Sequence, residues 1–458
     1  MIDRLLLFGA TGDLTARYLL PGMAALDAAG LLPSGFQLIA VGRHEWSDAD
    51  FRRWATEQFA RHGGGLPQGA VDQVLASARY SRADAGDAQA VVPLVAGGSP
   101  VAAYLALPPA VFAAAVSALH EAGLPPGSTI ALEKPFGQSL QDAVELNRLI
   151  AKTLAEDSVF RIDHFLAMST VQNMLGTRLA NRLLEPIWNS AHIESIEIVW
   201  DETVALEGRA GYYDGVGALR DMVQNHLLQL LCLAAMEPPV SAGERDLRDR
   251  KLDVLRSVRP LSKRDIRERT RRARYSAGRI GDRVLPSYAD EDGVDPSRRT
   301  ETFAQMELEI DSWRWKGTRF TLRTGKALGS DRSEVAVNFR PVPHLLFQEA
   351  DDPAPNVLRF GLDPETISLE LTGRGPGHTF QLSPLTLHAR LEPPVLPAYA
   401  SVLLDILNRN PALSIRGDEA EESWRIVEPV LDAWSQDVVP LEEYPAGSDG
   451  PVRPTGPR

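Results

Sequence analysis

Residues 5–14 read LLLFGATGDL, and this stretch decides the fold of the N-terminal part of the chain. Leu5–Phe8 is a short, wholly apolar run, as expected of a strand that is covered on both faces. Gly9-Ala10-Thr11-Gly12 breaks the run, and Asp13-Leu14 then opens a helical pattern of apolar residues. A strand, a tight glycine turn and a helix together let the backbone approach a pyrophosphate. The turn is GxxG rather than the full GxGxxG signature, so a plain turn is the alternative.

The next unit of strand and helix indicates which dinucleotide would fit. Gln37–Val41 is predicted to be the second strand, and Gly42-Arg43 follow it directly. An NAD enzyme usually has an acid at this point for the ribose 2′-hydroxyl, whereas an Arg suits a 2′-phosphate. Arg43 and the hydroxyl of Thr11 therefore predict NADP as the cofactor. Glu45 lies close enough in sequence that NAD stays possible.

Two more predicted strands, Val101–Leu107 and Thr129–Leu132, continue the alternation of strand and helix that is typical of a doubly wound sheet. The second of them runs into Glu133-Lys134-Pro135. A Lys at the carboxyl end of a parallel strand lies where such sheets bind their ligands. The alternative for Lys134 is a surface ion pair with Glu133.

Two acid-and-histidine pairs follow this region. The first is Asp163-His164 in RIDHFLAMSTVQN (161–173), and the second is Asp221 with His226 in RDMVQNHLLQLLC (220–232). Each pair alone is compatible with a structural role, as a simple hydrogen bond or as a core histidine with its partners satisfied. Together, downstream of a dinucleotide turn, they suggest a general base that is held by a carboxylate beside a redox cofactor.

The pattern changes after the first of these pairs. Six segments alternate between apolar and polar residues, which predicts a large, mostly antiparallel sheet with one covered face: Ser195–Trp200, Met306–Ile310, Phe320–Leu322, Val335–Phe339, Leu358–Leu362 and Ile367–Leu371. Helices at 220–236 and 397–408 are expected to pack on this sheet. The Pro- and Gly-rich tail from Pro440 is expected to be irregular.

Length and composition narrow the class of protein. At 458 residues the chain exceeds one core, so two domains are expected, with a formal net charge of −13 that argues against general nucleic-acid or membrane-surface binding. The single cysteine, Cys232, excludes an intramolecular disulfide and a cysteine-rich metal site, and no metal is expected. No apolar run approaches the length of a membrane span, and the start has no basic region, so a cytoplasmic protein is predicted.

Several motifs resemble those of the glucose-6-phosphate dehydrogenase family: FGATGDL (8–14), VGRHEW (41–46), ALEKPFG (131–137), RIDHFLAMSTVQNML (161–175), the run from 207 to 239, and EIDSWRWKGTRFTLRTGKAL (309–328). The resemblance covers nearly the whole chain. It implies an α/β Rossmann domain at residues 1–163, followed by an α+β domain at 164–458 that binds the substrate and forms oligomers. It also implies oxidation of a hexose 6-phosphate at C1, and association through the large sheet as a homodimer or homotetramer.

The resemblance assigns site residues by matching motif. His226 corresponds to the general base of the family, and Asp163 to the carboxylate that orients it. The residues that bind the sugar or bridge it to the cofactor are, by this resemblance, Lys134, His164, Glu202, Asp221 and Lys326. The residues that bind the cofactor are, by the same resemblance, Gly9, Thr11, Gly12, Asp13, Leu14, Arg43 and Lys134.

One departure from the family puts the substrate in question. The usual run is RIDHYLGK, whose His, Tyr and Lys hold the substrate phosphate. Here His164 is retained, whereas Phe165 lacks the Tyr hydroxyl and Met168 lacks the Lys ammonium. Glucose 6-phosphate, oxidised to 6-phosphogluconolactone, is the expected substrate. The alternatives are the same chemistry on an unphosphorylated or differently substituted sugar, and a catalytically silent member of the family.

Overall fold

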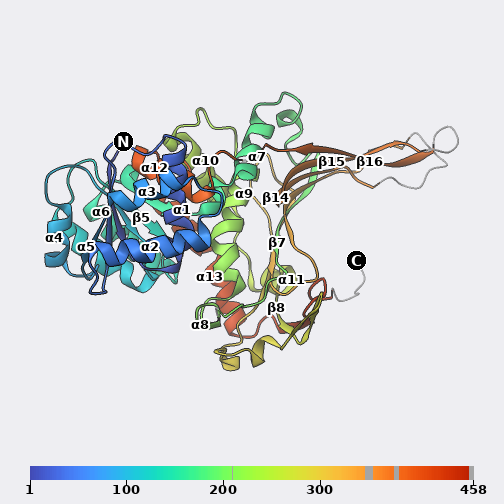
Figure 1. Ribbon diagram of the computed structural model, residues 1–458. Helices are drawn as coiled ribbons and strands as arrows, with labels where there is room; N and C mark the ends of the chain where they lie inside the picture. Colours follow the sequence, from blue (N-terminus) through green and yellow to red (C-terminus); the bar gives the residue numbers. More distant parts are fainter. Residues whose placement is uncertain (209, 346–353, 376–380, 393, 453–458) are drawn as a thin grey trace. The chain divides into compact units, whose positions relative to one another are not determined.

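The computed structural model describes residues 1–208, 210–345, 354–375, 381–392 and 394–452 (Figure 1). The chain forms two compact units, and neither is continuous in sequence. Unit 1 comprises Met1–Met168, Pro239–Asp249 and Pro393–Glu421. Unit 2 comprises Ser169–Pro238, Arg250–Glu392 and Glu422–Arg458. The division of the sequence at residue 163 into two domains stays a prediction.

Unit 1 is built on a six-stranded parallel sheet in the order β3-β2-β1-β4-β5-β6. Its strands are β1 (Arg4–Phe8), β2 (Gln37–Gly42), β3 (Ala78–Arg82), β4 (Ala102–Leu105), β5 (Thr129–Glu133) and β6 (Val159–Ile162). The strand order reverses between β1 and β4, and doubly wound sheets bind their ligands at the carboxyl ends of the strands at this point. The predicted Rossmann fold is confirmed, and its four predicted strands are present.

The helices of unit 1 pack along this sheet (Figure 1): α1 (Leu20–Ala28), α2 (Asp48–His62), α3 (Gln68–Ser77), α4 (Ala88–Val95), α5 (Phe112–Ala122), α6 (Leu140–Thr153) and α12 (Ala398–Asn408). The prediction that 397–408 packs on the large sheet is wrong. Leu403 and Leu407 of α12 join the same core as Leu19 and Met23. Gly22 of α1 permits this close approach, because a Cβ there would lie 3.3 Å from the amide nitrogen of Ala400.

Unit 2 is built on a nine-stranded sheet in the order β16-β15-β14-β13-β7-β12-β11-β8-β17. Its strands are β7 (Ile193–Asp201), β8 (Thr270–Ser276), β11 (Phe303–Leu308), β12 (Arg319–Gly325), β13 (Arg332–Phe339), β14 (Val357–Asp363), β15 (Glu365–Arg374), β16 (Leu382–Arg390) and β17 (Leu441–Pro445). Only β7–β12 and β8–β17 are parallel pairs, so the predicted mostly antiparallel sheet is confirmed. Five of the six predicted segments lie within its strands, and the sixth, Met306–Ile310, extends two residues beyond β11.

The C-terminal tail is not wholly irregular, contrary to the prediction. Leu441–Pro445 forms β17, which extends the sheet by pairing in parallel with β8. Tyr444 is buried, and its hydroxyl donates a hydrogen bond of 2.6 Å to the carbonyl oxygen of Lys326. The tail therefore holds the strand end that carries one of the predicted substrate residues.

The remaining α-helices and strands lie outside the two large sheets and the helices already named. They are α7 (Ser169–Leu179), α8 (Ala210–Tyr213), α9 (Leu228–Ala235), α10 (Glu244–Ser257), α11 (Lys263–Arg269), α13 (Gly417–Ser435), β9 (Gly278–Ile280) and β10 (Arg283–Leu285). Among the described residues, no helix combines the length and the apolar character needed to cross a membrane.

Candidate active site

The glycine turn after β1 lies against the ends of β2 and β4. Gly9 has φ +78°, and a Cβ there would come within 2.1 Å of the carbonyl oxygen of Ala106, just after β4. The amide nitrogens of Gly9 and Ala10 both donate to the carbonyl oxygen of Val41 at 3.1 Å. The turn therefore needs glycine, and it lies where the strand order reverses.

The helix after this turn begins at Asp13 and is a π-helix over Thr15–Leu19. The Thr15 hydroxyl donates to the carbonyl oxygen of Gly9 at 3.2 Å, which ties the helix to the turn. Leu14, which precedes the π-helical part, is itself in the αR conformation. The first amide groups of a helix are suited to a pyrophosphate. The helix start therefore fits a dinucleotide, whose phosphates would also lie beside Thr11, Gly12 and Asp13.

Arg43 follows β2 and is exposed. Within the part of the chain that the structure describes, its guanidinium makes no ion pair, so it can bind a ligand without losing a protein partner. With the glycine turn on the neighbouring strand, this arrangement fits a dinucleotide that carries a 2′-phosphate.

Lys134 follows β5, beside a carboxylic acid with an altered pKa. The Tyr104 hydroxyl donates a 2.5 Å hydrogen bond to Glu133 Oε1. Burial raises the pKa of Glu133 from 4.5 to about 7, and the nearby carboxylate of Asp163 adds to the rise, whereas Tyr104 and Lys134 oppose it. Near neutral pH, Glu133 is therefore partly protonated, and the charge next to Lys134 varies with pH.

Glu133→Gln is expected to flatten the pH dependence of the free energy of unfolding between pH 4.5 and about 7. In this window the unfolded chain releases the Glu133 proton while the folded chain retains it, so rising pH destabilises the wild-type fold. The full shift corresponds to roughly 3 kcal/mol. Gln stays neutral, so the variant should gain stability relative to wild type at pH 8.

Urea unfolding of both proteins at pH 5 and pH 8 measures this difference. Glu121→Gln, which changes an exposed carboxylate of α5, is the control and should keep the wild-type pH dependence. Parallel pH profiles for wild type and Glu133→Gln would contradict the prediction.

Asp163 is buried directly after β6, in unit 1. Its Oδ1 accepts a 3.0 Å hydrogen bond from the amide nitrogen of Phe165, which caps the 3₁₀-helix His164–Ala167. The segment 161–173 is therefore not one helix. Met168 has an extended backbone, and α7 begins after it.

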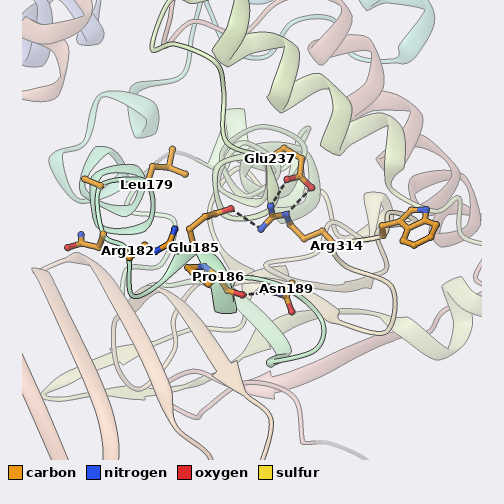
Figure 2. A pocket seen from close by; sticks show the side chains of 10 residues that line it. Leu179, Arg182, Glu185, Pro186, Asn189, Glu237 and Arg314 are labelled. Atoms are coloured by element: carbon orange, nitrogen blue, oxygen red, sulfur yellow. Dashed lines mark hydrogen bonds and ion pairs between the residues drawn. The ribbon is translucent and has the colours of Figure 1, made fainter.

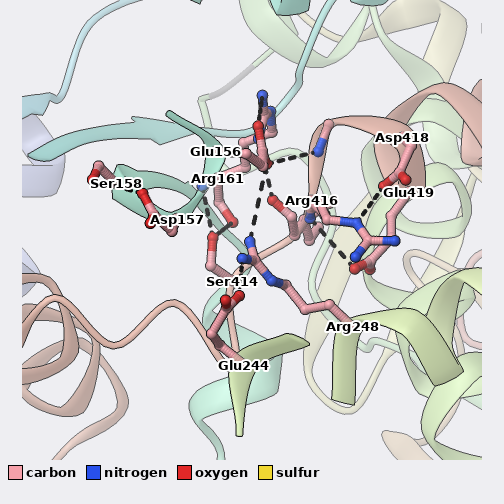
Figure 3. Close-up of polar contacts among 12 residues, drawn as sticks. Glu156, Asp157, Ser158, Arg161, Glu244, Arg248, Ser414, Arg416, Asp418 and Glu419 are labelled. Atoms are coloured by element: carbon pink, nitrogen blue, oxygen red, sulfur yellow. Dashed lines mark hydrogen bonds and ion pairs between the residues drawn. The ribbon is translucent and has the colours of Figure 1, made fainter. Parts of the chain in front are cut away.

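Strand β6 is held in place by a buried arginine (Figure 3). Arg161 donates from Nη1 to Glu156 Oε1 at 2.6 Å and from its backbone nitrogen to Ser414 Oγ at 2.9 Å. Arg416 lies near this cluster and bonds to Asp249 and Asp418. These contacts join three segments of unit 1 that are far apart in sequence, and they fix the strand from which Asp163 follows.

His164 lies between two aromatic rings. Its ring stacks on Tyr399 with centroids 5.5 Å apart and meets Phe165 edge-on at 5.1 Å. Tyr399 also stacks on Tyr18 at 5.0 Å. No local sequence pattern links α12 to residues 161–173, so Tyr399 could not be predicted as a neighbour of His164.

In unit 2, Asp221 and the buried His226 lie on a second π-helix, Leu219–Leu227. Residues five apart on an α-helix are about 140° apart around the axis. The i→i+5 hydrogen bonds of a π-helix bring such residues to the same side, one turn apart. The helix type therefore aligns the two predicted site residues, which the sequence pattern alone did not reveal.

The start of this π-helix is anchored by a buried carboxylate. Glu301 Oε1 accepts a 3.0 Å hydrogen bond from the amide nitrogen of Leu219. Burial raises the pKa of Glu301, and the backbone hydrogen bonds oppose the rise. Gly217 leaves room for the carboxylate, since a Cβ there would lie 2.5 Å from Glu301 Oε1.

The structure brings together two predicted substrate residues of unit 2. Lys326 Nζ lies 2.6 Å from Glu202 Oε2 and 5.4 Å from the centre of the Tyr213 ring. Glu202 follows β7 and Lys326 follows β12, which are parallel neighbours, so both residues lie at the carboxyl ends of adjacent strands. Asp163 and His226 belong to different units, and their pairing stays a prediction.

Unit 2 also contains a pocket of about 750 Å³ that includes no predicted site residue (Figure 2). Arg314 lies in it, bound at 2.5 Å to Glu237 and at 3.0 Å to Glu185. The hydrogen bond from Arg314 lowers the pKa of Glu237. Trp313 is fully exposed beside them. The lining of this pocket comes from α7, the segment after it and two distant loops, so no local sequence pattern predicts it.

Comparison with known families covers nearly the whole chain. Residues 6–173 match the family described as glucose-6-phosphate dehydrogenase, NAD binding domain. Residues 175–455 match the family described as glucose-6-phosphate dehydrogenase, C-terminal domain.

Individual relatives agree with these matches. The chain is 40% identical to glucose-6-phosphate 1-dehydrogenase of Mycolicibacterium smegmatis, over 97% of this chain and 94% of the relative. It is 38% identical to the Treponema pallidum enzyme of the same name, over 98% of this chain and 92% of the relative. The solved structure of a glucose-6-phosphate dehydrogenase in complex with glucose-6-phosphate is similar, with a TM-score of 0.90 at 30% identity, covering 99% of this chain and 96% of that one. The chain therefore belongs to the glucose-6-phosphate dehydrogenase family.

Proposed function

We propose that this chain oxidises glucose 6-phosphate at C1 to 6-phosphogluconolactone, with NADP as the acceptor. The observation that carries the proposal is the similarity to glucose-6-phosphate 1-dehydrogenases along both halves of the chain. The glycine turn, the helix start that follows it and exposed Arg43 support NADP. The small-molecule partner is thus a sugar phosphate.

His226 serves as the general base in this proposal. It accepts the proton of the anomeric hydroxyl as the hydride leaves C1. When bound, NADP supplies the hydride acceptor. Asp163 accepts a hydrogen bond from the other ring nitrogen, which selects the tautomer and stabilises the imidazolium that forms. Burial of both side chains supports this role, because water competes less for their hydrogen bonds.

The other site residues bind the sugar and orient it toward the cofactor. Glu202 and Lys326 offer an acceptor and a donor at one strand edge, which suits sugar hydroxyls. Asp221 would bind the sugar from the π-helix that it shares with His226. Lys134 and His164 complete the substrate side from unit 1.

A panel of sugars and sugar phosphates, followed by the absorbance of reduced cofactor, tests the proposal. Glucose 6-phosphate with NADP should yield reduced cofactor, and fructose 6-phosphate should not, because it has no anomeric hydrogen at C2 to lose as hydride. Turnover of free glucose alone would favour the alternative of an unphosphorylated substrate. If no sugar reacts and calorimetry shows no cofactor binding, the chain is a silent member of the family.

We propose in addition that the chain assembles through its large sheet, as a homodimer or homotetramer, in the cytoplasm. Strand β16 supports the first point, because Leu385 and Leu387 are 47% and 52% exposed on it. An exposed sheet region with apolar side chains favours association. Sedimentation of the purified protein would test this, and the mass of a single chain would contradict it.

A further inference from the structure

We infer that Arg82 and Glu45 set the cofactor preference of this chain. Arg82 would bind the 2′-phosphate of NADP beside Arg43, and Glu45 would accept a hydrogen bond from the ribose 2′-hydroxyl of NAD. The inference rests on the proposed function, since it concerns the cofactor of that reaction. It goes beyond that proposal, in which Arg43 is the only cation assigned to the cofactor.

Strand pairing places Arg82 beside the predicted site. Strands β2 and β3 are parallel neighbours, and Gly42 is paired with Arg82 in their register. The amide nitrogen of Ala83 donates to the carbonyl oxygen of Gly42 at 3.0 Å, so the pairing continues to the carboxyl end of the two strands. Arg43, which follows Gly42, and Arg82 therefore lie at the same sheet edge.

Arg82 is held by one acceptor that a phosphate can replace. Its Nη1 forms an ion pair with Glu45 Oε1, and the two side chains are 60% and 77% exposed. Because both side chains are exposed, this ion pair contributes little to the stability of the fold, and breaking it costs little free energy. A phosphate monoester carries nearly two negative charges at neutral pH, and it accepts two hydrogen bonds from one guanidinium. A 2′-phosphate would therefore outcompete the single carboxylate for Arg82.

The loop that carries Glu45 is fastened to β3, so Glu45 stays near Arg82. The Tyr80 hydroxyl donates to the carbonyl oxygen of His44 at 3.1 Å, and the Tyr80 amide donates to Asp48 Oδ1 at 2.7 Å. Trp46 stacks on His44 and lies 5.9 Å from the Tyr80 ring. Glu45 follows β2 closely, which is the region where an acid binds the ribose 2′-hydroxyl of NAD. The loop after β2 thus holds Glu45, the proposed acceptor for NAD, near Arg82, the proposed donor for NADP.

Opposite effects of two substitutions follow from this arrangement. Arg82→Ala should raise the Kd for NADP about tenfold, as expected for one charged hydrogen bond, and leave the Kd for NAD within about twofold. Glu45→Gln should lower the Kd for NADP, because it removes a negative charge and releases Arg82. It should raise the Kd for NAD. Arg82→Lys, which keeps the charge without the fork of donors, should fall between wild type and Arg82→Ala.

Calorimetric titration of the full chain with NADP, NAD, 2′,5′-ADP and 5′-AMP measures these effects without turnover. The ratio of the Kd values for 2′,5′-ADP and 5′-AMP isolates the contribution of the 2′-phosphate to binding. Arg43→Ala should weaken NADP and 2′,5′-ADP, and the control Arg79→Ala should change none of the four, because Arg79 is exposed on β3 away from its carboxyl end. If Glu45 acts through Arg82, the effects of Glu45→Gln and Arg82→Ala on NADP should not add.

Two results would overturn the inference. One is wild-type affinity for NADP and 2′,5′-ADP in an Arg82→Ala protein with an unchanged melting temperature. The other is equal weakening of NADP and NAD, which would mean that Arg82 supports the loop rather than the phosphate. If the wild-type chain bound none of the four ligands, the proposed function itself would fall.

Discussion

His226→Asn is expected to lower kcat by roughly 10²–10⁴, the usual contribution of a general base. Asn can fill much of the buried space of the imidazole and offers hydrogen bonds, but it cannot accept a proton at neutral pH. The fold and the Kd for NADP should therefore be kept. Steady-state assays with glucose 6-phosphate, together with calorimetric titration of NADP, measure the two properties separately.

His192→Asn is the matched control, since it makes the same substitution at an exposed histidine of unit 2. Its kcat should equal that of the wild type. Asp163→Asn should also lower kcat, because an amide can present an N–H to the imidazole and favour the wrong tautomer. Near-wild-type turnover by His226→Asn would show that another group accepts the proton.

Met168→Lys is expected to raise kcat/KM for glucose 6-phosphate by about tenfold to a hundredfold, as expected for one added charged contact. The wild-type chain should correspondingly show a weak preference for glucose 6-phosphate over glucose. Three other cations could hold the phosphate instead, but each would have to exchange a carboxylate partner for it. Arg17 pairs with Asp13 at 2.8 Å, Lys326 with Glu202 at 2.6 Å, and Arg332 with Glu334 at 2.7 Å.

Met168→Leu is the control for this prediction, because it changes shape without adding charge, and it should leave the preference unchanged. Phe165→Tyr should be combined with Met168→Lys rather than tested alone, because Phe165 is buried and a hydroxyl there requires a partner. A wild-type chain with a micromolar KM for glucose 6-phosphate and no activity on glucose would contradict the prediction. It would mean that the paired cations change partners when the substrate binds.

Sequence patterns predicted those parts of the fold that depend on neighbours along the chain. The run LLLFGATGDL predicted a buried strand, a glycine turn and a helix, and the structure shows why glycine is needed, since Gly9 lies against Ala106. Alternating apolar residues likewise predicted six strands of the large sheet, because one covered face requires a period of two.

Elements whose partners are distant in sequence were predicted poorly. The apolar face of α12 suits any core, and its sequence does not reveal that α1 offers the matching surface. The tail from Pro440 has a turn-like composition, yet Leu441–Pro445 becomes a strand because β8 presents an unpaired edge to it.

The candidate site shows the same division. Its residue types could be named from motifs, because the chemistry of a base, a carboxylate and a phosphate-binding cation requires those side chains. Only the tertiary structure decided which of them act together. The π-helix turns Asp221 to the side of His226, parallel pairing brings Glu202 to Lys326, and the β2–β3 register brings Arg82 to Glu45. Each depends on helix type or strand register, which packing against distant residues selects and local sequence does not encode.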